Sequence, residues 1–345
     1  THEDFFLAAG TLQRRRRAGG DESLFGVFLQ DQWQLGNRVV LSLGGRFDSW
    51  RSGEGSRLET VIASGGVLRS ESFPDREAET FSPRVGLAWQ VSERFQLAGS
   101  LYRSFRAPTI NELFRPFRVR NDITEANAAL ESETLQGGEI GVRYGTRKVR
   151  WSAYAFRSEL DDAIANVTMG QGPGAVAPCG FVPAGGVCRQ RRNLDQVRVD
   201  GLEADLKLIP SHRIELELSY LLSDPEVVTA TAQPELVGRR VAQVPEHQAA
   251  LRLAGRPLAD LDRFELGGMA RWVGEQFEDD LNERRLADYL AVDLLARWRV
   301  SSRWDFLAAV ENVFDETIET GETGDGLVSI GAPRLARLGL RYAWE

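Results

Sequence analysis

The sequence has very little lysine, histidine or cysteine, and it contains no long apolar run. No segment approaches the roughly 18 consecutive apolar residues that a membrane-spanning helix needs, so a helical membrane protein is excluded. The 42 Lys and Arg residues are outnumbered by 50 Asp and Glu, which gives a net charge of −8. The clustered basic face of a nucleic-acid binder is therefore not expected, and we predict no nucleic-acid partner.

The three histidines are too dispersed to support chemistry. They are His2, His212 and His247, and no pair of them has the spacing of a metal site. No Ser/His/Asp order can be argued from these positions either. We therefore predict that the protein is not an enzyme, and we expect no cofactor and no bound metal.

The two cysteines lie close together in a Gly/Pro-rich stretch, CGFVPAGGVC, as Cys179 and Cys188. No histidine or second cysteine pair is near, so a disulfide in an oxidising compartment is favoured over a metal site or two free thiols. We expect this disulfide at the tip of an outer loop.

Alternation of apolar and polar residues is the pattern that recurs along the chain. Leu216 and Leu218 alternate with Glu215, Glu217 and Ser219, and similar runs of about nine to eleven residues follow one another. One face of each predicted strand is apolar and the other ionic. A soluble β-sandwich also alternates in this way, so alternation alone leaves both classes open.

The connections between these runs differ strongly in length. Very short turns lie at 35–37, 91–94, 145–148, 210–212 and 300–302, and long connections lie at 52–78, 106–133, 159–190, 223–240, 276–286 and 315–332. Short and long connections alternate along the chain, as periplasmic turns and extracellular loops do in outer-membrane barrels. The fold class predicted is all-β, an antiparallel up-and-down transmembrane β-barrel.

The pattern predicts thirteen clear strands and a doubtful first one at 3–11. The clear strands are 23–35, 37–51, 79–91, 93–105, 134–145, 147–159, 190–209, 211–222, 241–255, 261–275, 286–299, 302–314 and 333–344. The total of about 14 is an even number, as bacterial single-chain barrels require.

Six of the eight tryptophans lie near the short turns or the C-terminus, which indicates an aromatic belt at one membrane interface. They are Trp33, Trp89, Trp151, Trp298, Trp304 and Trp344. The other two, Trp50 and Trp272, fall near the opposite strand ends and suggest a second belt.

The stretch RAPTINELF, residues 106–114, ends one of the predicted strands. Pro108 cannot donate to a strand ladder, and Thr109 and Glu112 have the spacing of a capping box. We therefore expect a capped helical turn at the base of a loop.

Several segments occur together in an order that resembles the C-terminal barrel half of a TonB-dependent outer-membrane receptor. They are SLYRSFRAPTINELF, NAALESETLQGGEIGVRY, RQRRNLDQVRVDGLEADL, ENVFDE and RLARLGLRY. The resemblance runs from about Phe25 to the end. It departs from the family where Ala128 and Ser132 replace the usual prolines, and where Glu345 follows the terminal aromatic Trp344.

The resemblance implies a barrel for active uptake of a scarce ligand, such as a ferric siderophore or a cobalamin-like chelate. It implies about 14 strands of a larger, roughly 22-stranded receptor barrel in the outer membrane of a Gram-negative-type bacterium. Residues 1–345 would be a single, partial barrel domain without the plug domain through which a TonB-type transducer acts. The sequence opens on Thr1 with no basic, apolar leader, so we expect a mature chain or a piece of a longer one.

Further partners implied are outer-membrane lipid and lipopolysaccharide, and we expect a monomer. Two alternatives remain at this point. One is a self-contained passive porin of about 14 strands, and the other is a secreted soluble β-protein that binds glycans.

Candidate site residues lie in the predicted outer loops. Cations interleaved with aromatic residues suit an anionic chelate, so a ligand role is considered for Arg115, Phe117, Arg118 and Arg120.

For two further groups of charged residues, a binding role is compared with simple exposure to solvent. The run 14–17 could meet lipopolysaccharide phosphates, although a solvated charge run is favoured. Glu278, Asp279 and Asp280 could hold a cation, although an unpaired acidic loop is commoner. Charged residues on the inner face of the strands, such as Arg271 and Asp293, are expected to form cross-strand ion pairs.

Overall fold

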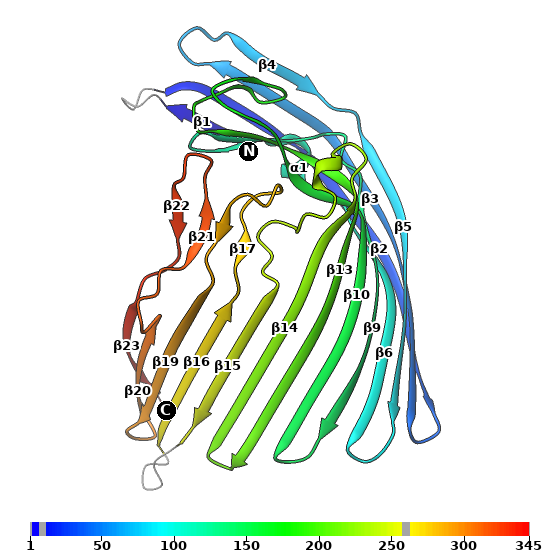
Figure 1. Cartoon of the computed structure of the whole chain (residues 1–345), viewed down its shortest axis with the longest axis vertical. Helices are drawn as coiled ribbons and strands as arrows, with labels where there is room; N and C mark the ends of the chain where they lie inside the picture. Colours follow the sequence, from blue (N-terminus) through cyan, green and yellow to red (C-terminus); the bar gives the residue numbers. More distant parts are fainter. Residues whose placement is uncertain (1, 7–11, 257–262, 345) are drawn as a thin grey trace.

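The computed structural model describes residues 2–6, 12–256 and 263–344. Its strands run up and down in one strongly curved sheet, with short turns at one end and longer, structured connections at the other (Figure 1). We call these the turn end and the loop end. None of the helices in the described ranges is long or apolar enough to cross a membrane.

The long strands belong to one sheet. They are β2 (Leu12–Leu35), β3 (Val39–Val61), β5 (Arg76–Gln90), β6 (Phe95–Arg106), β9 (Glu133–Gly145), β10 (Val149–Gln171), β13 (Val187–Ser211), β14 (Ile214–Thr229), β15 (His247–Gly255), β16 (Phe264–Val273), β19 (Tyr289–Arg299), β20 (Trp304–Glu311) and β23 (Leu335–Tyr342). Each of the thirteen predicted strands has its counterpart here, so the predicted strand order is confirmed.

The shorter elements gather at the loop end (Figure 1). They are β1 (His2–Phe6), β4 (Val67–Ser72), α1 (Ile110–Phe114), β7 (Phe117–Val119), β8 (Asp122–Glu125), β11 (Gly174–Val176), β12 (Gly180–Val182), the 3-10 helix η1 (Pro234–Leu236), β17 (Gln276–Phe277), β18 (Arg285–Leu286), β21 (Glu319–Glu322) and β22 (Val328–Ile330).

Neighbours along the chain are neighbours in the sheet, and every long pairing is antiparallel. The predicted short turns all lie at the turn end, where Gly36 has a φ of 65° that suits glycine. Within the described residues, no pairing joins β23 to β2 or β1.

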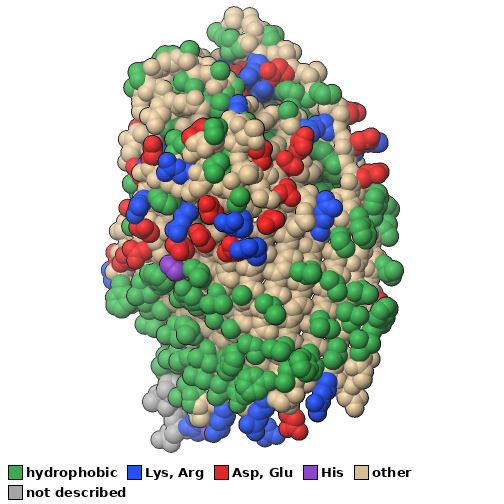
Figure 2. All heavy atoms as spheres, turned by 45° about the vertical axis from the view of Figure 1, so that its right-hand side comes forward, with side chains coloured by type: hydrophobic (Ala, Val, Ile, Leu, Met, Phe, Trp, Pro, Cys, Tyr) green, Lys and Arg blue, Asp and Glu red, His purple; other side chains and the backbone are tan. Residues whose placement is uncertain are grey.

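The convex face of the sheet carries an apolar band. In the register, Leu218 of β14 lies between Leu206 of β13 and Leu251 of β15, so leucines from three strands share one face. Figure 2 shows hydrophobic side chains gathered around the lower part of the convex surface, with a band of charged side chains above them. The predicted strand faces are therefore confirmed for these strands.

The concave face is lined by cross-strand ion pairs, as the sequence predicts. Glu217 lies 2.8 Å from both Lys207 and Arg252, and Arg271 lies 3.1 Å from Asp293. Each charge has a partner on a neighbouring strand, and this pairing offsets part of the cost of lining a sheet face with ions.

The long connections are more ordered than the sequence indicates. β2, β3, β10 and β14 run well beyond their predicted ends into stretches that were not predicted as strands. In the extensions of β10 and β14, Val167 and Val227 pack into a buried cluster, and backbone groups buried there need the ladder as partners. The prediction of structureless loops was wrong for this reason.

Two strand predictions fall partly outside the described residues. The doubtful strand at 3–11 is described only as β1, because residues 7–11 lie outside the described ranges. The predicted strand at 261–275 begins with residues 261–262, which also lie outside them.

Aromatic rings gather at the turn end. Tyr144 stacks on Trp151 at 6.0 Å, and Trp304 lies 4.6 Å from Tyr342, measured between ring centroids. Trp33, Trp89 and Trp298 are also exposed near short turns. Their assignment to a membrane interface stays a prediction.

The assignment of Trp50 to a second belt was wrong. Its side chain is only 2% exposed, because it points to the concave side and is covered by a loop. Trp272 does lie at the loop end of β16, where its ring stacks on His247 at 6.2 Å.

Candidate functional site

The capped turn predicted at Thr109 is confirmed, and it begins the loop that covers the loop end. The Thr109 backbone N–H donates to the Glu112 carboxylate at 2.7 Å, and the Glu112 N–H donates to the Thr109 hydroxyl at 3.3 Å. Burial opposes ionisation of Glu112, but the donors from Arg106 and Thr109 outweigh it and lower the pKa of Glu112. Pro108 immediately precedes this cap and lies two residues after Arg106, the last residue of β6.

Helix α1 places two apolar side chains onto the concave face of β2 and β3. Leu113 and Phe114 pack with Trp50 and Leu130 in a buried cluster. A Cβ at Gly55 would lie only 2.6 Å from the Phe114 ring, so this close approach requires glycine there. The helix therefore fastens the loop to the inside of the sheet.

The chain then crosses the loop end as a small hairpin. β7 pairs with β8, and β8 pairs in parallel with the start of β13 through Ile123 and Cys188. We call β7 and β8 together the mouth hairpin. The hairpin thus connects to β13, and the residue before it connects to β2, since Arg16 donates to the Pro116 carbonyl.

The four predicted ligand residues occupy different surroundings. Arg115 is paired with Glu3 at 2.6 Å, and Arg120 is paired with Asp325 at 3.1 Å. Phe117 and Arg118 line one cavity beneath the hairpin. The structure thus brings together two of the four and gives the other two a carboxylate partner each.

The run of arginines at 14–17 is part of strand β2 rather than a solvated loop. Alternation along the strand sends Arg14 and Arg16 to one face, where both contact Glu59, at 2.7 and 3.2 Å. Arg15, on the other face, pairs with Asp4. The preference for a solvated charge run was therefore wrong for Arg14 and Arg16.

Further ion pairs surround Arg14 and Arg16. Arg57 contacts Glu125 of the mouth hairpin at 3.0 Å, and Arg69 contacts the same carboxylate at 3.4 Å. Arg57 and Glu125 are both buried. This network holds the mouth hairpin against the loop-end part of β3 and β4.

The two cysteines form a disulfide beside the mouth hairpin, with their Cα atoms 5.9 Å apart. Cys188 lies in β13, and Cys179 lies between β11 and β12. The bond therefore ties the tip of the 172–187 connection to the point where β8 meets β13.

We expect the purified protein to contain this disulfide and to lose order in the 172–187 connection when both cysteines are replaced by serine. The crosslink limits the freedom of the open loop, by roughly 2–3 kcal/mol for a short loop, while the strands keep their ladders. Alkylation with mass analysis and limited proteolysis measure the two effects. Accessible thiols in unreduced protein, or loss of the whole fold in the variant, would contradict this expectation.

The acidic loop residues are engaged by protein donors. Asp279 accepts from the backbone N–H of Glu283 and of Arg284 and lies 3.1 Å from the Arg284 guanidinium. Burial would raise the pKa of Asp279, but these donors outweigh burial and lower it. Asp280 accepts from Thr168 at 2.6 Å. The expected unpaired acidic loop is therefore not what the structure shows.

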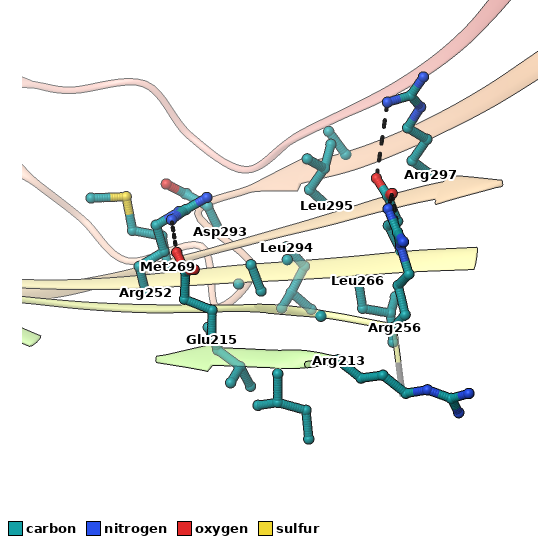
Figure 3. A pocket seen from close by; sticks show the side chains of 18 of the residues that line it. Arg213, Glu215, Arg252, Arg256, Leu266, Met269, Asp293, Leu294, Leu295 and Arg297 are labelled. Atoms are coloured by element: carbon teal, nitrogen blue, oxygen red, sulfur yellow. Dashed lines mark hydrogen bonds and ion pairs between the residues drawn. The ribbon is translucent and has the colours of Figure 1, made fainter. Parts of the chain in front are cut away.

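A broad hollow of about 1020 Å³ lies along the wall formed by β14, β15, β16, β19, β20 and β23. In Figure 3, Leu295 and Arg297 of β19 project to the side opposite Leu294. Ion pairs such as Glu215–Arg252 border Met269 and Leu295, whose apolar side chains lie on the concave face. This wall offers an extended surface to anything held inside the sheet.

Comparison with known proteins gives the same architecture. Residues 3–313 match the family described as TonB dependent receptor-like, beta-barrel. The iron-regulated outer membrane virulence protein of Vibrio cholerae is 24% identical over 304 residues, which cover 86% of this chain and 41% of that protein. The vitamin B12 transporter BtuB of Vibrio vulnificus is 24% identical over 250 residues, 72% of this chain and 35% of that protein.

Solved structures share the fold at lower identity. The ferric yersiniabactin uptake receptor FyuA from Yersinia pestis superposes with a TM-score of 0.73 at 14% identity, over 96% of this chain and 47% of that one. The chain thus spans about two fifths of the length of the curated relative from Vibrio cholerae, and less than half of this receptor.

Proposed function

The chain belongs to the TonB-dependent receptor β-barrel family, and on that premise we propose that it receives a scarce chelate at the cell surface for active uptake. The family consists of transport receptors rather than enzymes, and it places the protein in the outer membrane of Gram-negative-type bacteria. The ligand classes proposed are a ferric siderophore or a cobalamin-like chelate.

The observation that carries this proposal is the mouth hairpin and what lies under it. A loop held by a capped helix, a disulfide and ion pairs covers part of the loop end, and arginines line the space beneath it. A simple water-filled pore has no need of such a cover, whereas a receptor needs ordered side chains where its ligand first binds.

The proposed partners follow from the two faces of the sheet. Outer-membrane lipid and lipopolysaccharide would surround the convex apolar band, with the protein acting as a monomer. We propose that residues 1–345 form one barrel domain, and that a TonB-type transducer acts through a plug domain outside them. The concave wall with Met269 and Leu295 is the surface that such a plug would contact.

The alternative of a self-contained passive pore of about fourteen strands has less support. Closure of such a pore would need the first and last strands to pair, because open edges are costly in lipid. The described residues show no pairing of β23 with β2 or β1.

Uptake assays distinguish the two functions. Cells that lack their own receptors and express the full protein would be given ⁵⁵Fe-labelled siderophores or ⁵⁷Co-labelled cyanocobalamin. We expect one of these probes to accumulate only while the energy transducer is present, with matched transducer-deleted cells as the control. Equal accumulation in both strains, together with ion conductance in planar bilayers, would instead support the passive pore.

A further inference from the structure

An enclosed cavity of about 240 Å³ lies between the loop-end parts of β2, β3 and β4, the mouth hairpin and the disulfide loop. We call it the mouth cavity. Its charged lining consists of Arg14, Arg16, Arg69, Arg118, Glu59 and Glu125. Glu3 and Glu71 also pair with Arg16 and Arg69, and they share their charge with Arg115 and Arg57. The whole network thus contains six arginines and four glutamates among the described residues, which leaves an excess of two positive charges.

The two carboxylates are already fully used by the protein. Glu59 binds Arg14 and Arg16, and Glu125 binds Arg57 and Arg69. Both glutamates are buried, with exposed fractions of 5% and 4%. Their negative charge is thus committed to fixing the arginines and cannot also neutralise the rest of the lining.

Arg118 is the arginine of the mouth cavity that has no carboxylate partner among the described residues. Its Nε donates to the Arg120 carbonyl at 2.6 Å, and both Nη groups lack an acceptor in the described part of the chain. Burial and then the nearby charge of Arg14 lower the pKa of Arg118. The side chain remains partly exposed, so it can reach a molecule that enters from outside.

Aromatic side chains complete the mouth cavity and hold its cations in place. Phe5, Phe117 and Phe181 line it. The guanidinium carbons of Arg14 and Arg16 lie 4.5 and 4.9 Å from the centre of the Phe5 ring. These contacts restrict the arginine side chains, and the rings reduce access of water, which strengthens attraction to an anion.

We propose that the mouth cavity is a binding site for a small oxyanion with two negative charges, of the phosphate type. The volume admits one such group but not a whole chelate, and the network's excess of two positive charges matches the charge of the group. The Nη groups of Arg118, which have no acceptor among the described residues, can donate hydrogen bonds to it. The inference deepens the proposed function, because the oxyanion would be the part of the ligand that this cavity holds.

Two sources could supply this chemistry, a dissolved phosphate-type group or the phosphates of lipopolysaccharide. Arg14 and Arg16 lie on the same face of β2 as Gly20, where a Cβ would lie 2.9 Å from the Phe114 ring, and this is the concave face. Lipid surrounds the convex face in the proposed arrangement. The dissolved source is therefore the one assigned.

The test titrates inorganic phosphate into the purified full protein in detergent free of lipopolysaccharide, by calorimetry. We expect saturable binding that weakens at least about tenfold in the double variant Arg14→Gln/Arg118→Gln. The matched control is Arg17→Gln, which removes an exposed arginine from the same strand and should leave the affinity unchanged. In Arg14→Gln, Glu59 keeps its contact with Arg16, and far-UV circular dichroism checks that each variant folds.

Absence of saturable phosphate binding in the unmodified protein would overturn the inference, as would equal weakening in the Arg17→Gln control. Competition by lipopolysaccharide in the surrounding bilayer would overturn the assignment to a dissolved oxyanion. Because phosphate binding is measured without transport, a failed uptake assay with intact phosphate binding would count against the proposed function and not against the site.

Discussion

Leu218→Asp is expected to block assembly of the protein into membranes. Leu218 lies in the middle of the convex apolar band, between Leu206 and Leu251, and its side chain is 38% exposed to the surroundings of the barrel. A charge placed on the lipid face of a barrel near mid-depth costs on the order of 2 kcal/mol or more. Folding yield into lipid bilayers, followed by the heat-dependent shift in gel mobility, measures the effect.

Ala250→Asp is the matched control for this variant. Ala250 lies opposite Ser219 on one side and opposite Arg271 on the other, so the new carboxylate would face the concave side beside a cation. We expect near-normal assembly of this variant. Similar yields for Leu218→Asp and Ala250→Asp would show that the face assignment is wrong.

Asp122→Ala is expected to release two of the loops that surround the mouth hairpin. The buried Asp122 carboxylate accepts from the Val187 and Gly324 backbone N–H groups and lies 3.2 Å from the Arg189 guanidinium. Its loss leaves the Arg189 charge, whose side chain is only 13% exposed, without a carboxylate partner in the described part of the chain. Breaking a buried pair in this way costs roughly 3–5 kcal/mol.

Hydrogen exchange measures this release. We expect faster exchange in residues 172–187 and 319–330 of the Asp122→Ala variant, with little change in β14 or β15. Asp122→Asn keeps a hydrogen-bond acceptor but loses the charge. We therefore expect its exchange rates in these residues to lie between those of the unmodified protein and those of Asp122→Ala. The control is Asp21→Ala, because Asp21 is exposed and has no ion pair among the described residues. Unchanged exchange in both loops would contradict the role of Asp122.

The strand order could be predicted from the sequence because period-two alternation and turn length are local signals. Each strand was predicted from neighbouring residues of opposite hydrophobicity, such as Leu216 and Glu217, which alternate along a short segment. The extensions of β10 and β14 were missed because the residues there pack against loop partners that a local pattern does not contain. Val167 and Val227 are buried together with Ala230 and Leu236, which come later in the chain.

The mouth cavity could be predicted only in part. Phe117 and Arg118 were identified because cations and aromatic residues alternate in one short segment. The inward direction of Arg14 and Arg16 could not be predicted, since a run of four identical residues carries no alternation. Their partner Glu59 lies more than forty residues away along the chain, so no local pattern indicates the pairing.

If the chain forms the wall of an outer-membrane barrel, β14 must present one face to lipid and the other to water. The measurement is a nitroxide scan, one label at a time over residues 214–222, with oxygen and a water-soluble nickel chelate as relaxing agents. We predict that oxygen accessibility peaks at residues 216, 218 and 220, and that nickel accessibility peaks at 215, 217 and 219. Equal accessibility of neighbouring positions, or the opposite alternation, would contradict the claim that this chain forms the wall of an outer-membrane receptor barrel.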